Sequence, residues 1–316
     1  MRVFVCLVLL LAIAVKNPAQ ETETDHPFRF GFSSVLMPEV NENDARAAMK
    51  VWAETVVRSG MVRADPNVLF SHDSATLLAG LRSRTVDGVA VSTSEFLALR
   101  DQVQFNRYVF AVIDGNIWDE YILLVHQDGG LAKIEDLRGH TLNLQHHSRT
   151  CLATPWLDTL LREKGLSPTR DFFSQVLAEN KLTKAVLPVF FRKIDACLVT
   201  RKGFKTMGEL NPQVSRQLRV LAASPPIVPT GFFFRTGFPQ AQQDRCLAEF
   251  TRVHTSPSGQ QILTVFQTER LEEHPASVLD SAIELLAKHE RLCGGTNAAP
   301  FDTARLARDP AKGLVQ

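Results

Sequence analysis

The sequence predicts an α/β protein of two lobes, each a mainly parallel sheet flanked by helices, with a ligand cleft between the lobes. Three observations support this fold class. Short apolar or β-branched runs alternate with stretches whose apolar residues recur every three or four positions, as in βαβ units. A second series of the same kind starts near residue 141. The 316 residues are enough for two lobes with separate cores.

The first half of the chain contains the first series. Strands are expected at residues 28–33, 67–71, 87–92, 109–112 and 121–126, and helices at 43–57, at 74–82 and from about 94. Because helices follow strands directly, the strands should pair in parallel, with each helix crossing over the sheet.

The second half repeats the pattern and then returns to the first lobe. Strands are expected at residues 141–144, 172–177, 195–199, 219–221 and 232–235, and helices at 153–164, 183–192, 240–255, 259–266 and 276–292. The strands at 121–126 and 219–221 are expected to be the crossings. The predicted organisation is lobe 1 at 27–120, lobe 2 at 121–221 and the return to lobe 1 at 222–295. A mobile tail is expected at 296–316.

The N-terminus has the pattern of a secretory signal. Met1 and Arg2 precede an apolar run from Val3 to Val15, too short to span a bilayer as a helix, and small residues follow. We expect residues 1–19 to be removed on export, with an uncleaved anchor as the alternative. Cys6 lies inside the run and not at its end, so a lipoprotein is not expected.

Composition excludes several classes of protein. The 35 Lys and Arg residues balance 34 Asp and Glu residues, for a net charge of +1, so a nucleic-acid partner is not expected. Four cysteines follow the signal in no zinc-binding spacing; Cys246 and Cys293 are the favoured disulfide pair, and free thiols are the alternative. The His146-His147 pair has no second pair at helical spacing. Neither a metal nor a cofactor is expected.

Polar residues recur where predicted strands give way to helices. Ser33 and Ser34 follow the first strand, Ser71 the second, and Ser92 with Thr93 the third. Residues 145–151 (QHHSRTC) lie between a strand and a strongly amphipathic helix, where Ser148 or Thr150 can cap the helix and Arg149 adds a charged donor. Hydroxyls at successive turns converge on one sheet edge, and helix N-termini attract anions. An anion site in the cleft is therefore a hypothesis.

The ordered blocks of the chain resemble periplasmic phosphate/phosphite/phosphonate-binding proteins of ABC transporters, which have the type II periplasmic-binding-protein fold. The blocks are residues 67–96, IEDLRG at 134–139, HSRTCLATP at 147–155, LLREKGLSPTRDFF at 160–173, IDACLV at 194–199 and LAASPP at 221–226. The resemblance covers residues 28–292. It rests on the order and spacing of the blocks.

The resemblance implies a set of ligand contacts. The family's Ser-Thr-Ser-Gly loop corresponds to Ser148, Arg149, Thr150 and Cys151 here, and its usual aromatic hydroxyl at the third-strand turn is replaced by Phe96. In the family, acidic residues accept the ammonium group of an aminophosphonate. The matching positions in this sequence fall near Glu179 and Thr200, and Thr200 is not acidic. The ligand-binding residues expected from the turns and the resemblance together are Ser33, Ser34, Ser71, Ser92, Thr93, Tyr121, His147, Ser148, Arg149, Thr150, Glu179 and Thr200.

Three functions are compatible with these residues. The first is a non-catalytic binding protein that closes on a small oxyanion, such as a phosphonate or phosphate, and delivers it to an ABC permease. The second is a ligand sensor that presents its closed state to a membrane histidine kinase. The third is an enzyme with His146, His147 and Cys151 as a reactive cluster, although no acid or base partner is evident.

Overall fold

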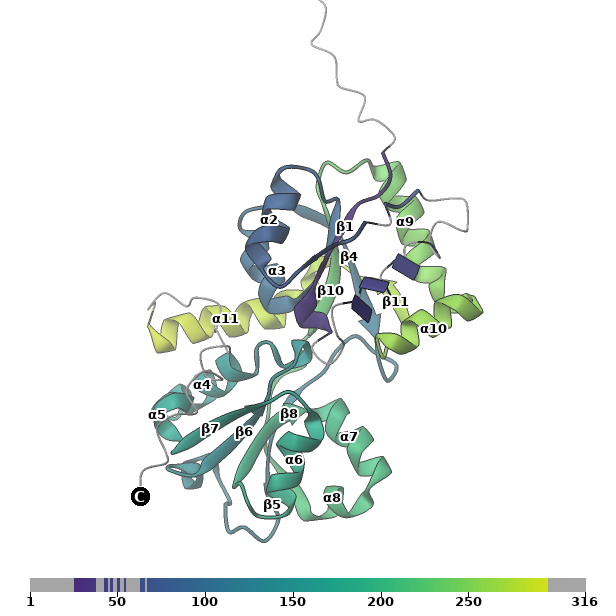
Figure 1. The fold of residues 1–316 in the computed structure, drawn as a ribbon. Coiled ribbons are helices and arrows are strands. Elements are labelled where there is room, and N and C mark those ends of the chain that lie inside the picture. The colour runs from purple at the N-terminus through teal and green to yellow at the C-terminus, as the bar shows by residue number, and fades with distance from the viewer. Residues whose placement is uncertain are drawn as a thin grey trace, which may run out of the picture.

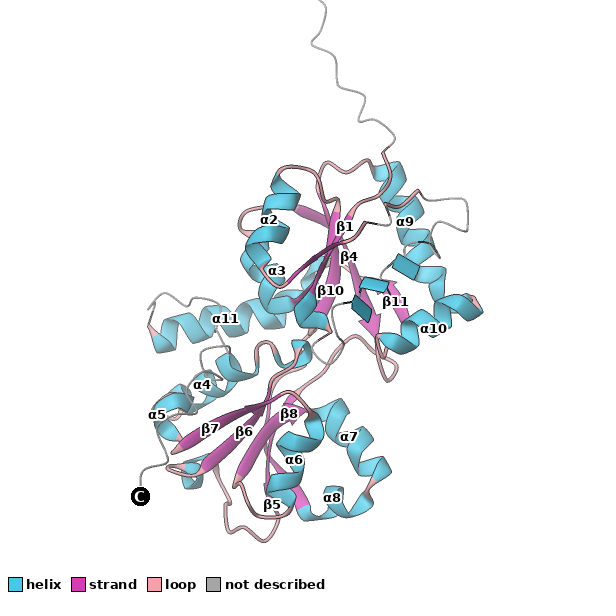
Figure 2. Ribbon diagram, viewed as in Figure 1, coloured by secondary structure: helices cyan, strands magenta, loops and turns pink. Residues whose placement is uncertain are grey.

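The computed structural model describes residues 26–37, 43–44, 46–47, 50–51, 54, 63–65 and 67–294. The predicted signal at 1–19, most of the predicted helix at 43–57 and the predicted tail at 296–316 lie outside these residues. Within them the chain forms two α/β lobes (Figures 1 and 2). No helix in the described part of the chain is long and apolar enough to cross a membrane.

The first lobe contains a six-stranded mixed sheet in the described residues. Its strands are β1 (Phe30–Ser33), β2 (Leu69–Ser71), β3 (Gly88–Ser92), β4 (Phe105–Val112), β10 (Thr230–Arg235) and β11 (Arg270–Glu273), in the order β11-β4-β10-β3-β1-β2. β1 pairs in parallel with β2 and β3, whereas β10 pairs antiparallel with β3 and β4. The returning chain therefore enters the middle of the sheet.

Helices cover both faces of this sheet (Figure 1). α2 (Ser74–Arg82) and α3 (Thr93–Arg100) pack on one face, and α9 (Gln240–Arg252) and α10 (Pro257–Val265) pack on the other. The short 3₁₀ turns of this lobe are η1 (Ser34–Leu36), η4 (Val253–Thr255) and η5 (Ala276–Leu279). The α9 face is rich in phenylalanine, with Phe28, Phe232 and Phe250 in mutual ring contact.

The second lobe contains a five-stranded mixed sheet. Its strands are β5 (Tyr121–His126), β6 (Thr141–Gln145), β7 (Gln175–Glu179), β8 (Ala196–Thr200) and β9 (Leu218–Ala223), in the order β7-β6-β8-β5-β9. Its helices are η2 (Ile134–Leu137), η3 (Ser148–Thr150), α4 (Ala153–Glu163), α5 (Thr169–Phe172), α6 (Leu182–Phe190), α7 (Arg201–Leu210) and α8 (Pro212–Gln217). α4 packs on one face, and α6 and α7 pack on the other.

Two segments join the lobes. The strands expected to be the crossings, at 121–126 and 219–221, are β5 and β9 of the second sheet. The segments that join the lobes lie just outside them: the first crossing runs from β4 to β5 and the second from β9 to β10. They pair through an antiparallel bridge, in which the backbones of Asp119 and Ile227 exchange hydrogen bonds of 3.0 and 2.8 Å. Next to it, Ser224 Oγ accepts a hydrogen bond from the Tyr121 amide (2.9 Å). The crossings therefore form one narrow connection.

The last helix, α11 (Asp280–Cys293), contacts both lobes (Figure 1). The sequence places it in the return to the first lobe, yet it packs along α4 of the second. Ala282 and Leu285 are buried in the core of the second lobe, whereas Leu279, just before the helix, is buried in the core of the first. α11 is thus a third link between the lobes.

Some elements differ from the sequence-based expectation. The strand expected at 172–177 is wrong at its start, because Pro168 precedes the single turn α5 and the strand begins at Gln175. α7, α8 and β11 were not predicted: α7 is polar and contains Gly203 and Gly208, and β11 is a short charged edge strand. β1, β3, β5 and β8 lie within two residues of their predicted bounds.

The favoured disulfide is wrong, since all four described cysteines are free thiols. Cys246 lies in the phenylalanine-rich core of the first lobe. Cys293 ends α11, where its thiol is close to Arg162 of α4. Because α11 leaves the first lobe, the two sulfurs are held in separate parts of the molecule.

Candidate functional site

The carboxyl ends of the parallel strands of both lobes meet at the two crossings. Ser92, the last residue of β3, lies opposite Thr230 at the start of β10. Thr200, the last residue of β8, lies opposite Tyr121 at the start of β5. Thr93 donates from its hydroxyl to the Val228 carbonyl of the second crossing (2.5 Å). The strand-end residues predicted in the two lobes therefore border one region.

In the first lobe, a carboxylate absent from the predicted set collects the hydroxyl groups. Ser33 Oγ donates to Glu95 Oε1 at 2.6 Å. Ser92 donates to Glu95 Oε2 from both its hydroxyl (2.7 Å) and its backbone amide (2.8 Å). Ser92 and Glu95 also form the capping box of α3. The structure thus brings Ser33 and Ser92 together, with their hydroxyl protons directed at Glu95.

The hydroxyl groups of Ser34 and Ser71 have hydrogen-bond partners within the first lobe. Ser34 Oγ lies 2.5 Å from His72 Nδ1. Ser71 Oγ accepts from the Asp73 amide and donates to the Asp73 carbonyl, which closes the turn before α2. Phe96 is buried and stacks on Phe233 with 3.9 Å between ring centroids, so its ring is part of the core.

In the second lobe, the expected capping of the helix at 153 is wrong. The chain makes the 3₁₀ turn η3 before α4 starts, so the N-cap of α4 is Leu152, which has no side-chain cap. Thr150 Oγ1 donates back to the Gln145 carbonyl at 2.6 Å. His147 Nδ1 accepts from the Arg149 amide (3.1 Å) and lies 3.4 Å from Ser148 Oγ.

Burial sets the protonation of the groups around this turn. Desolvation, followed by the charge of Arg149, lowers the pKa of His147 to about 4, so its ring is a neutral acceptor at neutral pH. Burial raises the pKa of the Tyr121 phenol, whose oxygen accepts from the Leu152 amide at 3.2 Å. Burial also raises the pKa of the Cys151 thiol, opposite to what an activated nucleophile requires.

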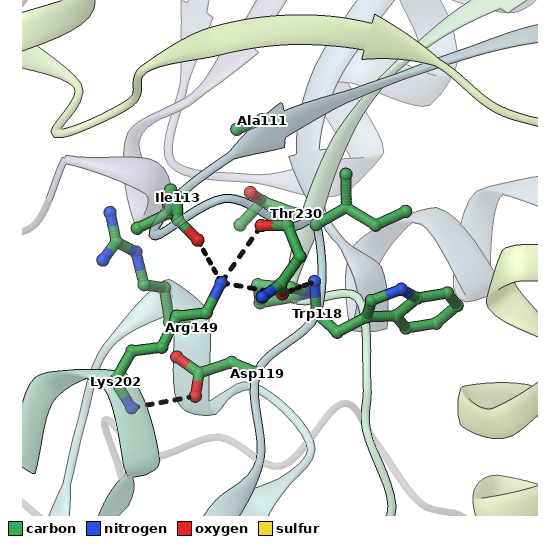
Figure 3. Close-up of a pocket in the computed structure, with 10 residues that line it drawn as sticks. Ala111, Ile113, Trp118, Asp119, Arg149, Lys202 and Thr230 are labelled. Atoms are coloured by element: carbon green, nitrogen blue, oxygen red, sulfur yellow. Dashed lines mark hydrogen bonds between the residues drawn. The ribbon is translucent and has the colours of Figure 1, made fainter. Parts of the chain in front are cut away.

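A pocket opens between the lobes beside the first crossing (Figure 3). Its empty volume is about 270 Å³, open solvent included. The second lobe contributes Arg149 and Lys202, and the first contributes Ala111 and Thr230. Asp119 of the crossing lies beneath the two cations, and desolvation raises the pKa of its carboxyl group.

The two cations of the pocket have different hydrogen bonding (Figure 3). Lys202 Nζ donates to the Ile113 carbonyl and to both oxygens of Asn116, the latter two at 3.0 Å. Arg149 reaches from the second lobe to the first, where Nη2 lies 3.4 Å from the Gln267 carbonyl. Among the described residues, this long contact is the one hydrogen bond of the Arg149 guanidinium, so most of its five N–H donors remain for a ligand.

The predicted acceptor positions lie along the end of the second sheet. Glu179 ends β7 and is paired in register with Gln145 of β6. Thr200 caps α7, its oxygen accepting from the Gly203 amide at 3.2 Å. Gln145 is buried, and its Oε1 has no hydrogen-bond partner among the described residues. Neither Glu179 nor Thr200 lines the pocket of Arg149 and Lys202.

Comparison with known proteins identifies the family of this two-lobed chain. Residues 35–278 match the model of a family described as ABC transporter, phosphonate, periplasmic substrate-binding protein. The chain belongs to this family. Its members are periplasmic binding proteins and not enzymes, and a component of an ABC transporter implies a permease partner. No curated protein matches the sequence.

Solved structures share the fold of this phosphonate-binding-family protein at low sequence identity. XAC2383 from Xanthomonas citri, bound to chloride ion, is 18% identical with a TM-score of 0.61, covering 84% of this chain and 98% of its own. PhnD1 from Prochlorococcus marinus in complex with methylphosphonate is 14% identical, with a TM-score of 0.59 and the same coverage. PA3383, a binding protein component of an ABC phosphonate transporter from Pseudomonas aeruginosa, is 15% identical, with a TM-score of 0.58 and coverage of 89% and 93%.

Sequence reasoning missed three charged residues of the site. Glu95 was visible as the last residue of a Ser-x-x-Glu capping box, a motif that marks the start of a helix. Lys202 follows the Thr200 cap of α7, a helix that was not predicted. Asp119 had no local signal, since its burial depends on how the lobes meet. In the part of the chain described, no cluster of three or more His, Cys, Asp or Glu residues could hold a metal ion.

Proposed function

We propose that the protein is the exported solute-binding component of an ABC transporter and captures a small phosphonate- or phosphate-like oxyanion between its lobes. The observation that carries this proposal is the position of Arg149. Its guanidinium lines the pocket between the lobes and keeps most of its donors unused. A planar guanidinium can bind two oxygens of a phosphonate or phosphate group at once.

The surroundings of Arg149 favour an anion of small size. Burial at this position costs the charged guanidinium hydration, and a bound oxyanion would restore hydrogen bonds to it. Lys202 contributes a second positive charge to the same pocket. The pocket is small, so the group held here is a compact head group and not an extended chain.

Arg149 also couples binding to the positions of the lobes. It belongs to the second lobe and contacts Gln267 of the first, so an anion held by Arg149 would lie against both. The two paired crossings give the lobes a narrow connection about which they can hinge. Ligand binding would then favour the closed arrangement, the form expected to be delivered to the permease.

Isothermal titration calorimetry of the chain without residues 1–19 tests the proposal, with methylphosphonate and inorganic phosphate as probes. A hydrogen bond to a charged group contributes about 1.5–3 kcal/mol, so Arg149→Ala should weaken binding roughly tenfold to a hundredfold. Arg216→Ala, which removes the same charge from exposed α8, should bind like the wild type. Absence of binding to every phosphorus oxyanion, or equal affinity for Arg149→Ala and the wild type, would contradict the proposal.

Export is a separate part of the proposal and has its own test. The apolar run from Val3 to Val15 between a basic start and a polar stretch supports a cleaved signal. The intact mass of the protein recovered from the periplasmic fraction should correspond to the chain without about its first 19 residues. Recovery of the full-length mass in the membrane fraction would show an uncleaved anchor instead.

A further inference from the structure

The first lobe supplies a negative charge at the edge of the cleft. The donors at the ends of β1 and β3 are the Ser33 hydroxyl and the hydroxyl and amide of Ser92, and all three point at the Glu95 carboxylate. A carboxylate offers about four lone-pair directions. Three are used here, which leaves one on Oε1, beside Ser33. Glu95 therefore occupies the donors that a ligand anion would otherwise take, and it keeps one acceptor free.

The first turn of α3, which contains Glu95, meets the second lobe at Pro229. The Pro229 carbonyl accepts a hydrogen bond from the Thr93 amide at the start of α3 (2.8 Å) and another from the Cys151 thiol of the second lobe (3.6 Å), and Pro229 lines the pocket. Cys151 directly precedes the start of α4 and follows Arg149 by two residues. Glu95 thus lies on the first-lobe side of this contact and Arg149 on the second-lobe side; Arg149 lines the pocket itself, and Glu95 follows the contact residue Thr93 by two positions.

We propose that Glu95 is a specificity-determining residue that accepts a hydrogen bond from the ligand, so that the protein selects oxyanions carrying an O–H or N–H donor. This rests on the proposed function, because it assumes that the ligand anion binds at Arg149. The anionic oxygens then face the second lobe and the donor faces Glu95. An oxyanion without a proton would place its oxygens against a carboxylate, where charge repulsion and an unmade hydrogen bond both oppose binding.

A purely structural role for Glu95 predicts something different. The capping box of α3 requires an acceptor at position 95, and glutamine meets this requirement as well as glutamate does. If Glu95 only caps the helix, Glu95→Gln should leave the choice of ligand unchanged. If it reads a ligand proton, the same substitution should alter that choice, because the amide offers a donor to the cleft in place of a charge.

Hydrogen methylphosphonate and methanesulfonate distinguish the two roles. In mildly acidic buffer both are monoanions of nearly the same shape, and only the phosphonate carries an O–H group. The affinities of both are measured by calorimetry for the wild type, Glu95→Gln and Asp73→Asn. The last variant removes one negative charge from the N-cap of α2 in the same lobe and keeps a good capping side chain.

We expect the wild type and Asp73→Asn to prefer the phosphonate by about tenfold or more, and Glu95→Gln to reduce that preference to about threefold or less. Melting temperatures of the three proteins, measured alongside, identify any loss of folding. Equal binding of the two probes by the wild type, or an unchanged preference in folded Glu95→Gln, would overturn the inference and leave the proposed function standing. Failure of the wild type to bind either probe would refute both.

Discussion

The buried ion pair between Asp87, directly before β3, and Arg235, at the end of β10, gives the sharpest prediction of stability. Asp87 is fully buried directly before β3, where its Oδ1 accepts from Arg235 Nη2 at 2.8 Å and its Oδ2 from the Arg29 amide at 3.0 Å. The Arg235 side chain is only 4% exposed, so it cannot recover water if its partner is lost. The Arg29 side chain is 28% exposed and can recover water. Asp87→Ala should therefore lower the free energy of unfolding by about 3–5 kcal/mol, mostly because Arg235 is left as a buried charge without a partner.

Urea unfolding followed by circular dichroism measures this loss. With a denaturant dependence of about 3 kcal/mol per molar, the midpoint should fall by roughly 1–2 M. Replacing both partners, as Asp87→Ala with Arg235→Met, should restore at least half of the loss, because no charge is then left buried without a partner. Glu135→Ala breaks an exposed pair with Lys164, which solvent screens, and should change the stability little. A single variant as stable as Glu135→Ala, or a double variant no better than the single, would refute the reasoning.

Two further predictions concern the site. Lys202→Met removes the donors to Ile113 and Asn116, so amide hydrogen exchange in the first crossing should accelerate about tenfold or more. The control is Lys205→Met, which removes an exposed ion pair with Asp114 of the same crossing and should change the exchange rate little. The folded pKa of His147, about 4, lies below its unfolded value of 6.5, so the unfolded chain binds more protons between these values and stability falls as the pH drops from 6.5 to 4. His147→Gln should remove up to about 3 kcal/mol of that fall, read from urea midpoints across this pH range, and an unchanged pH slope would contradict the cause assigned to it.

Local patterns explain which parts of the fold were predictable. Helix α2 has the predicted bounds, because the leucines on one face of its nine residues and the capping Asp73 directly before them are all visible in the sequence. Strand β5 has the predicted bounds because its six residues are all buried and mostly apolar. The sequence did not predict α7, because this segment has few apolar residues and contains two glycines, which lower helix propensity. Packing of α7 against β8 and α8 compensates for this low propensity.

The candidate site was harder to predict, because its chemistry depends on contacts between distant residues. Ser33 and Ser92 could be found as strand-end hydroxyls, but their common partner depends on β1 and β3 pairing in parallel, which places Ser33 beside a glutamate 62 residues away. The same limit applies to Arg149. Its position before α4 was visible in the sequence, whereas its reach to Gln267 requires the return of the chain to the first lobe.

The proposed site has cations on the second-lobe side and Glu95 on the first-lobe side, and the two cations differ in their hydrogen bonds. Arg149 and Lys202 are both cations of the second lobe in one pocket, yet Lys202 spends its donors on three oxygens of the first crossing and Arg149 makes a single long contact. Under the proposed function, the binding energy for an anion would come mainly from Arg149, while Lys202 would stiffen the connection about which the lobes hinge. In the proposed arrangement Glu95 would repel a second negative charge, so the preferred ligand would direct its anionic oxygens at Arg149 and a hydrogen-bond donor at Glu95. The near-neutral net charge of the chain is compatible with the proposed arrangement, in which selection of the anion would depend on how the charges are divided across the cleft and not on their sum.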